Sequence, residues 1–181
     1  MDHFTEQVVV KRQRVLDEIA YYVSWVILVV AGLIGMMYLS ACFSAFAAGQ
    51  FDIFTLVFAL LNVGIAVGLF FFHDRLRTEY EYTFTNGSLD FAQVFNNAKR
   101  KSLGSLNVRT VEAFGPVNGS SFQRYISMPG IQQSRWFLNR DANLYYFYFQ
   151  KDSNRKIIIF EPNEELLDMV RQYVPRSVQQ E

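Results

Sequence analysis

Residues 21–46 read YYVSWVILVVAGLIGMMYLSACFSAF and residues 53–72 read IFTLVFALLNVGIAVGLFFF, and neither run contains a charged side chain. Only a short segment that includes Gly49 and Gln50 separates them. An ordinary core helix is roughly 8–20 residues long and has polar positions on one face. Uncharged apolar runs of about 18 residues or more are typical of membrane spans, because about 20 helical residues cross the hydrocarbon core. The two runs therefore predict a transmembrane helical hairpin.

The first run has one feature of a cleaved signal peptide, the small-x-small sequence Ala45-Phe46-Ala47. The apolar region of a signal peptide is roughly 7–15 residues long. The run here is longer, and a second run follows it directly. We therefore expect the first run to stay in the protein as a span.

Basic residues flank the hairpin at its base. Lys11, Arg12 and Arg14 precede the first run, and Arg75 and Arg77 follow the second. Short loops rich in Lys and Arg stay in the cytoplasm. The predicted localisation is therefore the cell membrane, with two spans in the lipid bilayer, both termini cytoplasmic and the tip outside.

Small residues recur at four-residue spacing in both spans: Ala31 and Gly35 in the first, Gly64 and Gly68 in the second. Small residues let helix backbones approach each other in a membrane. Counting outward from the connection brings the two pairs to similar depths, which predicts packing of Ala31 and Gly35 against Gly64 and Gly68. The alternative is a homodimer through Gly64 and Gly68.

Asn62 is the one strongly polar side chain in the middle of the second span. An unpaired amide is costly in lipid, so Asn62 should face protein. One interpretation is a pore or substrate site. The other, which we favour because the amide carries no charge, is a hydrogen bond that fixes helix register, with Tyr38 as a candidate partner.

After Arg77 the pattern changes from helical to alternating. Tyr80, Tyr82 and Phe84 share one face of a predicted strand. Asn86-Gly87 follows and is a strong signal for a tight hairpin turn, because both residues tolerate positive φ. The return strand is then interrupted by the basic residues 99–101. Further strands are predicted for Leu106, Val108 and residues 111–114, for residues 135–138, for the aromatic residues 144–149, which should be central, and for residues 156–160.

Two helices are expected in the same region. Residues 120–127, between two turn signals, are compatible with a short helix. Pro162 and the acidic residues after it open a second helix with one apolar stripe, and Pro175 ends it. The order of several antiparallel strands followed by one amphipathic helix is that of pleckstrin-homology-like (PH-like) domains.

The predicted fold class is thus a membrane α-helical hairpin plus a soluble, mainly antiparallel β domain closed by a C-terminal helix. The expected division is a cytoplasmic segment (1–19), the hairpin (20–72), a linker (73–78), the β domain (79–175) and a tail (176–181). The first segment is read either as a helix on the membrane surface or as the solvated start of the first span.

The chain also resembles a family of small, uncharacterised Gram-positive bacterial membrane proteins with two spans and a PH-like cytoplasmic domain. The sequences that carry this resemblance are Glu79-Tyr80-Glu81-Tyr82, Thr85-Asn86-Gly87, Lys99-Arg100-Lys101, Asn107-Val108-Arg109, Pro116-Val117, Ile159-Phe160-Glu161-Pro162-Asn163-Glu164 and Tyr173-Val174-Pro175-Arg176. The resemblance implies the fold and the membrane location, but no particular activity.

Composition argues against several kinds of function. The chain has 17 basic and 17 acidic residues, so no net field directs it to nucleic acid. Its one cysteine, Cys42, lies in the first span and allows neither a disulfide framework nor a zinc site. The region after His73 contains no His or Cys and no phosphate-binding or dinucleotide-binding glycine motif. We expect no enzyme activity, no metal and no cofactor, and an acid/base enzyme that uses only Asp and Glu stays open.

Lys99, Arg100 and Lys101 form the most suggestive polar cluster. Each basic residue near an anionic leaflet contributes about 1 kcal/mol of binding free energy. The cluster is therefore a candidate contact for an anionic phospholipid headgroup or a protein partner, and the alternative is a solvated strand end. The function expected from the whole sequence is a membrane-anchored binding module. The alternatives are a self-assembling subunit of a membrane complex, which includes a homo-oligomer, and an unrecognised enzyme or transporter component.

Overall fold

The computed structural model describes residues 3–50, 52–151 and 153–180, and it divides into two units. One unit is Gln13–Thr78, which contains the apolar runs. The other combines the N-terminal residues up to Arg12 with the chain from Glu79 onward. The N-terminal residues therefore belong to the β domain, and the expected separate segment 1–19 is corrected.

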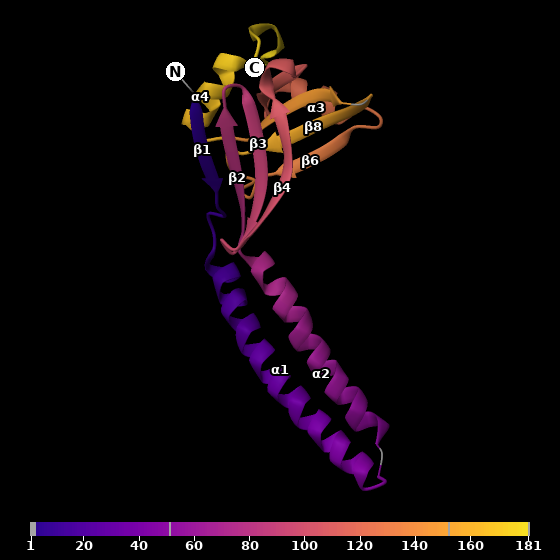
Figure 1. Cartoon of the computed structure of the whole chain (residues 1–181). Coiled ribbons are helices and arrows are strands. Elements are labelled where there is room, and N and C mark those ends of the chain that lie inside the picture. The colour runs from indigo at the N-terminus through magenta and orange to yellow at the C-terminus, as the bar shows by residue number, and fades with distance from the viewer. Residues whose placement is uncertain (1–2, 51, 152, 181) are drawn as a thin grey trace. The chain divides into compact units, whose positions relative to one another are not determined.

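Gln13–Thr78 forms two long helices, α1 (Val15–Ala47) and α2 (Ile53–Phe72), which run side by side in opposite directions (Figure 1). A short 3-10 helix, η1 (His73–Leu76), follows. The Asp52 carboxylate caps α2 by accepting hydrogen bonds from the backbone amides of Phe54 and Thr55, each at 3.1 Å. Both helices are long and apolar enough to cross a membrane, and only 11% and 6% of their most apolar stretches are buried. A helix from the core of a soluble protein would be mostly buried.

The N-terminal residues form a strand, β1 (Phe4–Val9), rather than a helix. β1 pairs antiparallel with β2 (Thr78–Thr85), from Phe4 opposite Thr85 to Val9 opposite Tyr80. Its inward positions include Thr5 and Val9, which are buried. The pairing means that the helical hairpin is inserted between two neighbouring strands of one sheet.

The first sheet has the order β1-β2-β3-β4. β3 (Ser88–Phe95) returns from β2 through Asn86 and Gly87, whose φ values of 49° and 97° fit the predicted tight turn. β4 (Lys99–Asn107) pairs antiparallel with β3 and contains a bulge opposite Phe91 and Ala92. The basic residues at 99–101 therefore lie in a strand, where an interruption was expected.

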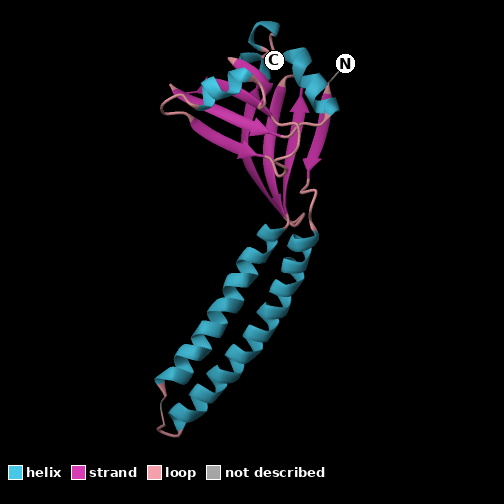
Figure 2. Cartoon of the chain, turned by 180° about the vertical axis from the view of Figure 1, so that it is seen from behind, coloured by secondary structure: helices cyan, strands magenta, loops and turns pink. Residues whose placement is uncertain are grey.

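The second sheet has the order β5-β7-β8-β6, and Figure 2 shows both sheets in one view. Its strands are β5 (Ala113–Pro116), β6 (Gln132–Trp136), β7 (Tyr145–Lys151) and β8 (Asn154–Phe160). β7 pairs antiparallel with β5 and β8, whereas β6 runs parallel to β8. The expected strand over residues 106–114 is broken, because the Asn107 side chain accepts a hydrogen bond from the Arg109 amide and starts a 3-10 turn, η2 (Val108–Thr110).

The aromatic strand β7 is central, as predicted, and it serves two cores. Phe147 packs between the sheets with Phe91 and Phe160, whereas Tyr146 and Tyr148 lie in a second cluster on the outer face. The short helix α3 (Ser120–Ile126), which was also predicted, covers that outer face.

The C-terminal helix α4 (Glu164–Tyr173) begins at Asn163, whose side chain accepts a 2.8 Å hydrogen bond from the Leu166 amide. Leu166 and Val170 of its apolar stripe enter the core between the sheets. A short turn, η3 (Arg176–Val178), follows, and the Gln180 amide donates to the Phe114 carbonyl at 2.7 Å, so the tail docks on β5. The predicted fold class, with its hairpin, mainly antiparallel sheets and closing helix, is confirmed.

Candidate functional site

The helical hairpin packs through Ala31 and Gly35 of α1, as predicted, but not against the expected residues of α2. A Cβ atom on Gly35 would lie 2.8 Å from Val63 Cγ2 and 3.5 Å from the Ala59 carbonyl oxygen. Gly35 is therefore the point of close approach, and its partners are Ala59 and Val63.

Gly64 and Gly68 lie off this interface, which corrects the predicted pairing. A Cβ atom on either glycine would have no neighbour within 4 Å. Gly64 follows Val63 by one residue, and one residue turns the helix by about 100°. Counting residues from the tip therefore predicted how deep each glycine lies, but it did not predict which face of α2 packs against α1. The homodimer through Gly64 and Gly68 stays a prediction.

Asn62 finds its partner within its own helix. Its amide Nδ2 donates to the Phe58 carbonyl at 2.9 Å, and the Tyr38 ring instead packs edge-on against the Phe58 ring, with centroids 4.9 Å apart. The expected hydrogen bond to Tyr38 is replaced by this local one, which agrees with a structural role for the amide.

Aromatic and charged side chains join the two helices at the base of the hairpin. His73 is buried. Its Nδ1 lies 3.0 Å from the Leu69 carbonyl oxygen, and the centroid of its ring lies 4.8 Å from that of the Trp25 ring. The Arg77 guanidinium lies 3.8 Å above the Tyr21 ring and pairs with Glu18. This cluster fixes the end of α2 against the start of α1.

The basic cluster of β4 does not form a single patch. Lys99, Arg100 and Lys101 are all exposed, but side chains alternate along a strand, so Arg100 lies on the opposite face from the two lysines. Arg100 Nε pairs with Glu81 Oε2 at 2.9 Å. One of the three charges is thus partly neutralised within the domain.

Sequence reasoning missed a buried polar pair, Asn139 and Glu161, because nothing in their local sequence marks them. Glu161 Oε1 accepts from Asn139 Nδ2 at 2.8 Å, and Glu161 Oε2 accepts from the Asn139 amide at 3.1 Å. Asn139 in turn binds the chain between β1 and α1, since its Oδ1 accepts from the Arg12 amide at 2.8 Å and its Nδ2 donates to the Val10 carbonyl at 3.0 Å. The pair holds the N-terminal strand in the domain.

The buried Tyr82 hydroxyl links β2 to Trp136 of β6 and to the backbone of Glu161. The hydroxyl donates to the Trp136 carbonyl, and the Glu161 amide donates to that hydroxyl at 3.3 Å. Burial raises the pKa of the Tyr82 phenol far above its ordinary value. Tyr82 is therefore a neutral structural group rather than an acid/base group.

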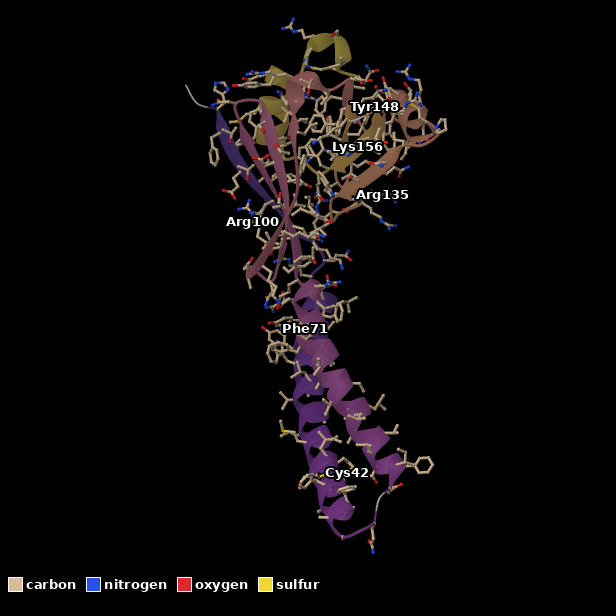
Figure 3. The ribbon with its side chains drawn as sticks, turned by 45° about the vertical axis from the view of Figure 1, so that its right-hand side comes forward. Cys42, Phe71, Arg100, Arg135, Tyr148 and Lys156 are labelled. Carbon is tan, nitrogen blue, oxygen red and sulfur yellow. The ribbon has the colours of Figure 1, made fainter. Side chains whose placement is uncertain are left out.

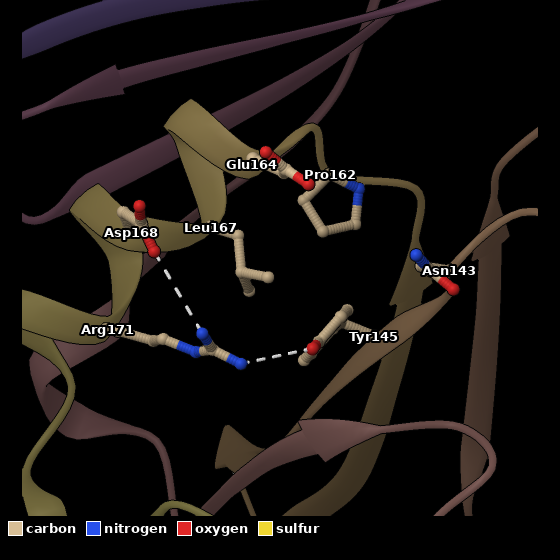
Figure 4. A pocket seen from close by; sticks show the side chains of 7 residues that line it. All are labelled: Asn143, Tyr145, Pro162, Glu164, Leu167, Asp168 and Arg171. Carbon is tan, nitrogen blue, oxygen red and sulfur yellow. Dashed lines mark hydrogen bonds and ion pairs between the residues drawn. The ribbon is translucent and has the colours of Figure 1, made fainter.

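A hollow of about 330 Å³ lies between α4 and the start of β7 (Figure 4). Arg171 is one of the residues that line it, with Nη2 3.2 Å from the Tyr145 hydroxyl and Nη1 3.9 Å from Asp168 Oδ1. Glu164 and Asp168 belong to α4, where acidic groups near the N-terminus are favourable without any ligand. The polar groups of this hollow are thus explained within the domain.

The β domain gains one histidine, His3, which directly precedes β1, and this corrects the expectation that the domain has none. The His3 ring packs edge-on against the Tyr173 ring, with centroids 5.7 Å apart. Within residues 3–50, 52–151 and 153–180, no three His, Cys, Asp or Glu side chains are grouped so that they could hold a metal ion.

One comparison with known proteins gives a match over nearly the whole chain. The family model described as "Bacterial PH-like domain (DUF6106)" matches residues 1–180. No match to the chain was found among curated proteins or among solved structures.

Proposed function

We propose that this chain, which belongs to the bacterial PH-like domain family DUF6106, spans the cell membrane twice and holds its PH-like domain at the cytoplasmic face as a binding module. The observation that carries the proposal is the insertion of two long, exposed, apolar helices between the paired strands β1 and β2. A family relationship alone gives a fold and not an activity.

The insertion supports an even number of spans. β1 and β2 are hydrogen-bonded neighbours, so the chain that enters α1 and the chain that leaves α2 must lie on one side of a membrane. The basic residues on both sides of the hairpin support the cytoplasm as that side. Cleavage after Ala47 would also remove β1 from its sheet, which speaks against a signal peptide.

Binding fits the polar groups of the domain better than catalysis does. Asn139, Glu161 and Tyr82 are used to hold the fold together, and His3 contacts an aromatic ring. The exposed lysines of β4 remain candidates for contact with anionic lipid headgroups or with a protein partner. We expect no nucleic acid partner, because the chain carries no net charge.

Membrane fractionation tests the anchoring part of the proposal. The protein should stay in the membrane pellet in alkaline carbonate and be released by mild detergent. Affinity purification from that detergent extract then tests the binding part: a defined partner supports the module. Recovery of the chain only as a homo-oligomer would favour the self-assembling subunit, and release by carbonate alone would refute the membrane spans.

A further inference from the structure

The core-facing side of the second sheet ends in lysines. Ile158 and Phe160 of β8 belong to the core between the sheets, and Lys156 lies on the same face because side chains alternate along a strand. In β7, Phe147 and Phe149 face the same core, and Lys151 continues their row. Two neighbouring strands thus carry a cation where the alternation leads one to expect an apolar side chain.

These lysines border a hollow of about 170 Å³, which we call the lysine mouth. Its apolar lining comes from Leu103 of β4, Trp136 of β6, Phe149 and Ile158. The mouth lies where the first sheet ends at β4 and the second ends at β6, so its two sides are the edges of the two sheets.

The β4 side of the mouth contains a glycine that faces the Trp136 ring. Gly104 has a φ of 154°, and a Cβ atom there would meet Trp136 Cη2 at 3.7 Å. Ser134, which is on the same face of β6 as Trp136, also lines the hollow, whereas the Ser105 hydroxyl pairs with that of Ser88 at 3.1 Å. Apolar surface, one hydroxyl group and two ammonium groups therefore meet at one place.

Lys156 lacks a partner for its charge within the described part of the domain. It is half-buried on a strand with neighbours on both sides, since β8 lies between β7 and β6. Among the residues that the structure describes, no carboxylate lies within ion-pair distance of Lys151 or Lys156. Figure 3 labels Lys156 of β8 and Arg135 of β6; Arg135 lies opposite Ile159 in the register, so it belongs to the other face of the sheet. An unpaired, partly desolvated cation favours an anion nearby.

We propose that the lysine mouth binds an anionic group, a carboxylate or phosphate, that is attached to a short apolar chain. Lys151 and Lys156 neutralise the anion, Ser134 donates a hydrogen bond to it, and Trp136 covers the apolar part. The volume is below the roughly 300–1,000 Å³ of pockets for drug-sized ligands, so the mouth takes only the head of a larger molecule. This inference rests on the proposed function, since it names the ligand class of the binding module.

The competing explanation is that the lysines protect open sheet edges. Inward-pointing charges at the end of a sheet discourage pairing with another chain, and long basic side chains reach water while their stems cover apolar surface. The two explanations predict different results when a lysine loses its charge: weaker anion binding in the first, and self-association in the second.

Tryptophan fluorescence of the full chain in nanodiscs of neutral phosphatidylcholine tests the proposal. The chain has two tryptophans, and Trp25→Phe leaves Trp136 as the only reporter. Hexyl phosphate and hexanoate should change its emission in a saturable way. Hexanol and inorganic phosphate, which each carry half of the ligand, should bind at least tenfold more weakly. Equal responses to hexanol and hexyl phosphate, or no saturable response, would overturn the proposal.

Two neighbouring residues provide matched variants. Lys156→Gln should weaken hexyl phosphate binding at least tenfold, whereas Arg155→Gln, which removes a charge from the opposite face of β8, should not. Lys151→Gln serves in place of Lys156→Gln if the latter melts well below the parent chain. Unchanged binding in the lysine variant, together with self-association on gel filtration, would show edge protection instead.

The source of the anion is distinguished by repeating the titration in nanodiscs that contain phosphatidylglycerol. Competition by this lipid identifies a bilayer headgroup as the source, and unchanged binding identifies a soluble ligand. Ligand binding is measured separately from carbonate extraction. Absence of ligand binding would refute the lysine mouth but not the membrane spans, and release by carbonate would refute the spans but not the lysine mouth.

Discussion

Gly35 is the residue on which the packing of the helical hairpin most depends. Its Cα faces the Val63 backbone, whose nitrogen would lie 3.1 Å from an added Cβ atom. Gly35→Leu should therefore lower the free energy of unfolding by about 1–3 kcal/mol, the usual cost of overpacking. Thermal unfolding in detergent micelles, followed by circular dichroism, measures the change.

Gly64→Leu is the matched control, since it adds the same side chain to the same hairpin where a Cβ atom has open space. It should leave the melting temperature unchanged. Equal destabilisation by the two substitutions would mean that α2 presents Gly64 to α1, contrary to the structure.

Tyr82 gives the domain a specific dependence on alkaline pH. Burial raises the pKa of its phenol, so the folded protein keeps a proton that the unfolded chain releases above its ordinary pKa of about 10. The stability is fully present below that pH and falls above it, by about 1.4 kcal/mol per pH unit for one such group. Tyr82→Phe should cost about 1 kcal/mol at pH 8, through the lost hydrogen bond to Trp136.

The same substitution should make the loss of stability between pH 10 and pH 11 shallower. Near-UV circular dichroism during thermal unfolding at several pH values supplies the comparison. An identical slope in the parent chain and in Tyr82→Phe would assign the alkaline sensitivity to other groups.

For single residues, the sequence predicted which side chains of α1 lie at the hairpin interface and roughly how deep they lie. It did not predict which residues of α2 they contact. Ala31 and Gly35 were found at the hairpin interface because small residues at four-residue spacing mark one helix face. Their partners on α2 were mistaken because Val63 and Gly64 lie at nearly the same depth and differ mainly by a rotation of about 100° around the helix. Asn139 and Glu161 were missed, because hydrogen bonds between residues 22 positions apart leave no local signal.

At the level of elements, the stability that β1 contributes depends on the few side chains that face the core. Val9 is 3% exposed and Val8 is 48% exposed, although they are neighbours in one strand. Val9→Ala should cost about 1–2 kcal/mol through lost apolar burial, and Val8→Ala should change the stability by less than about 0.5 kcal/mol. Thermal unfolding of both variants in detergent tests the strand, and the reverse order would indicate a different register.

The hairpin should also be removable as one element. Val9 lies opposite Tyr80, so Val10 and Glu79 are the next facing residues of β1 and β2. Joining Val10 to Glu79 through Asn-Gly would convert the insertion into an ordinary β-hairpin. The resulting chain should be soluble without detergent and give a near-UV circular dichroism spectrum of a folded domain. Aggregation of this chain would show that the β domain needs the helices for folding.

β1 was misread because residues 1–19 were considered together with the first span. The periodic signal in six residues is short, and its partner β2 is separated from it by the whole hairpin. β2, α3 and α4 were predicted because alternation, turn residues and capping residues lie within each segment. The parallel pairing of β6 with β8 depends on contacts between distant parts of the chain, so no local sequence pattern predicts it.

For the molecule as a whole, the insertion of the hairpin into the β domain links the two parts of the chain. Asn139 and Asp141 bind the chain at Arg12, where it leaves the domain toward α1. On the other side only Arg77 separates η1 from β2. Both connections between the two units are thus short, and neither is a long flexible linker.

Labelling of single cysteines in intact cells tests the membrane topology most directly. Cys42→Ser provides a background without cysteine, and Gln50→Cys places a thiol at the tip of the hairpin, while Asn118→Cys places one in an exposed loop of the β domain. A membrane-impermeant maleimide should label Gln50→Cys in intact cells and Asn118→Cys only after the cells are permeabilised. Labelling of Asn118→Cys in intact cells, or protection of both sites until lysis, would contradict a two-span protein with a cytoplasmic PH-like domain.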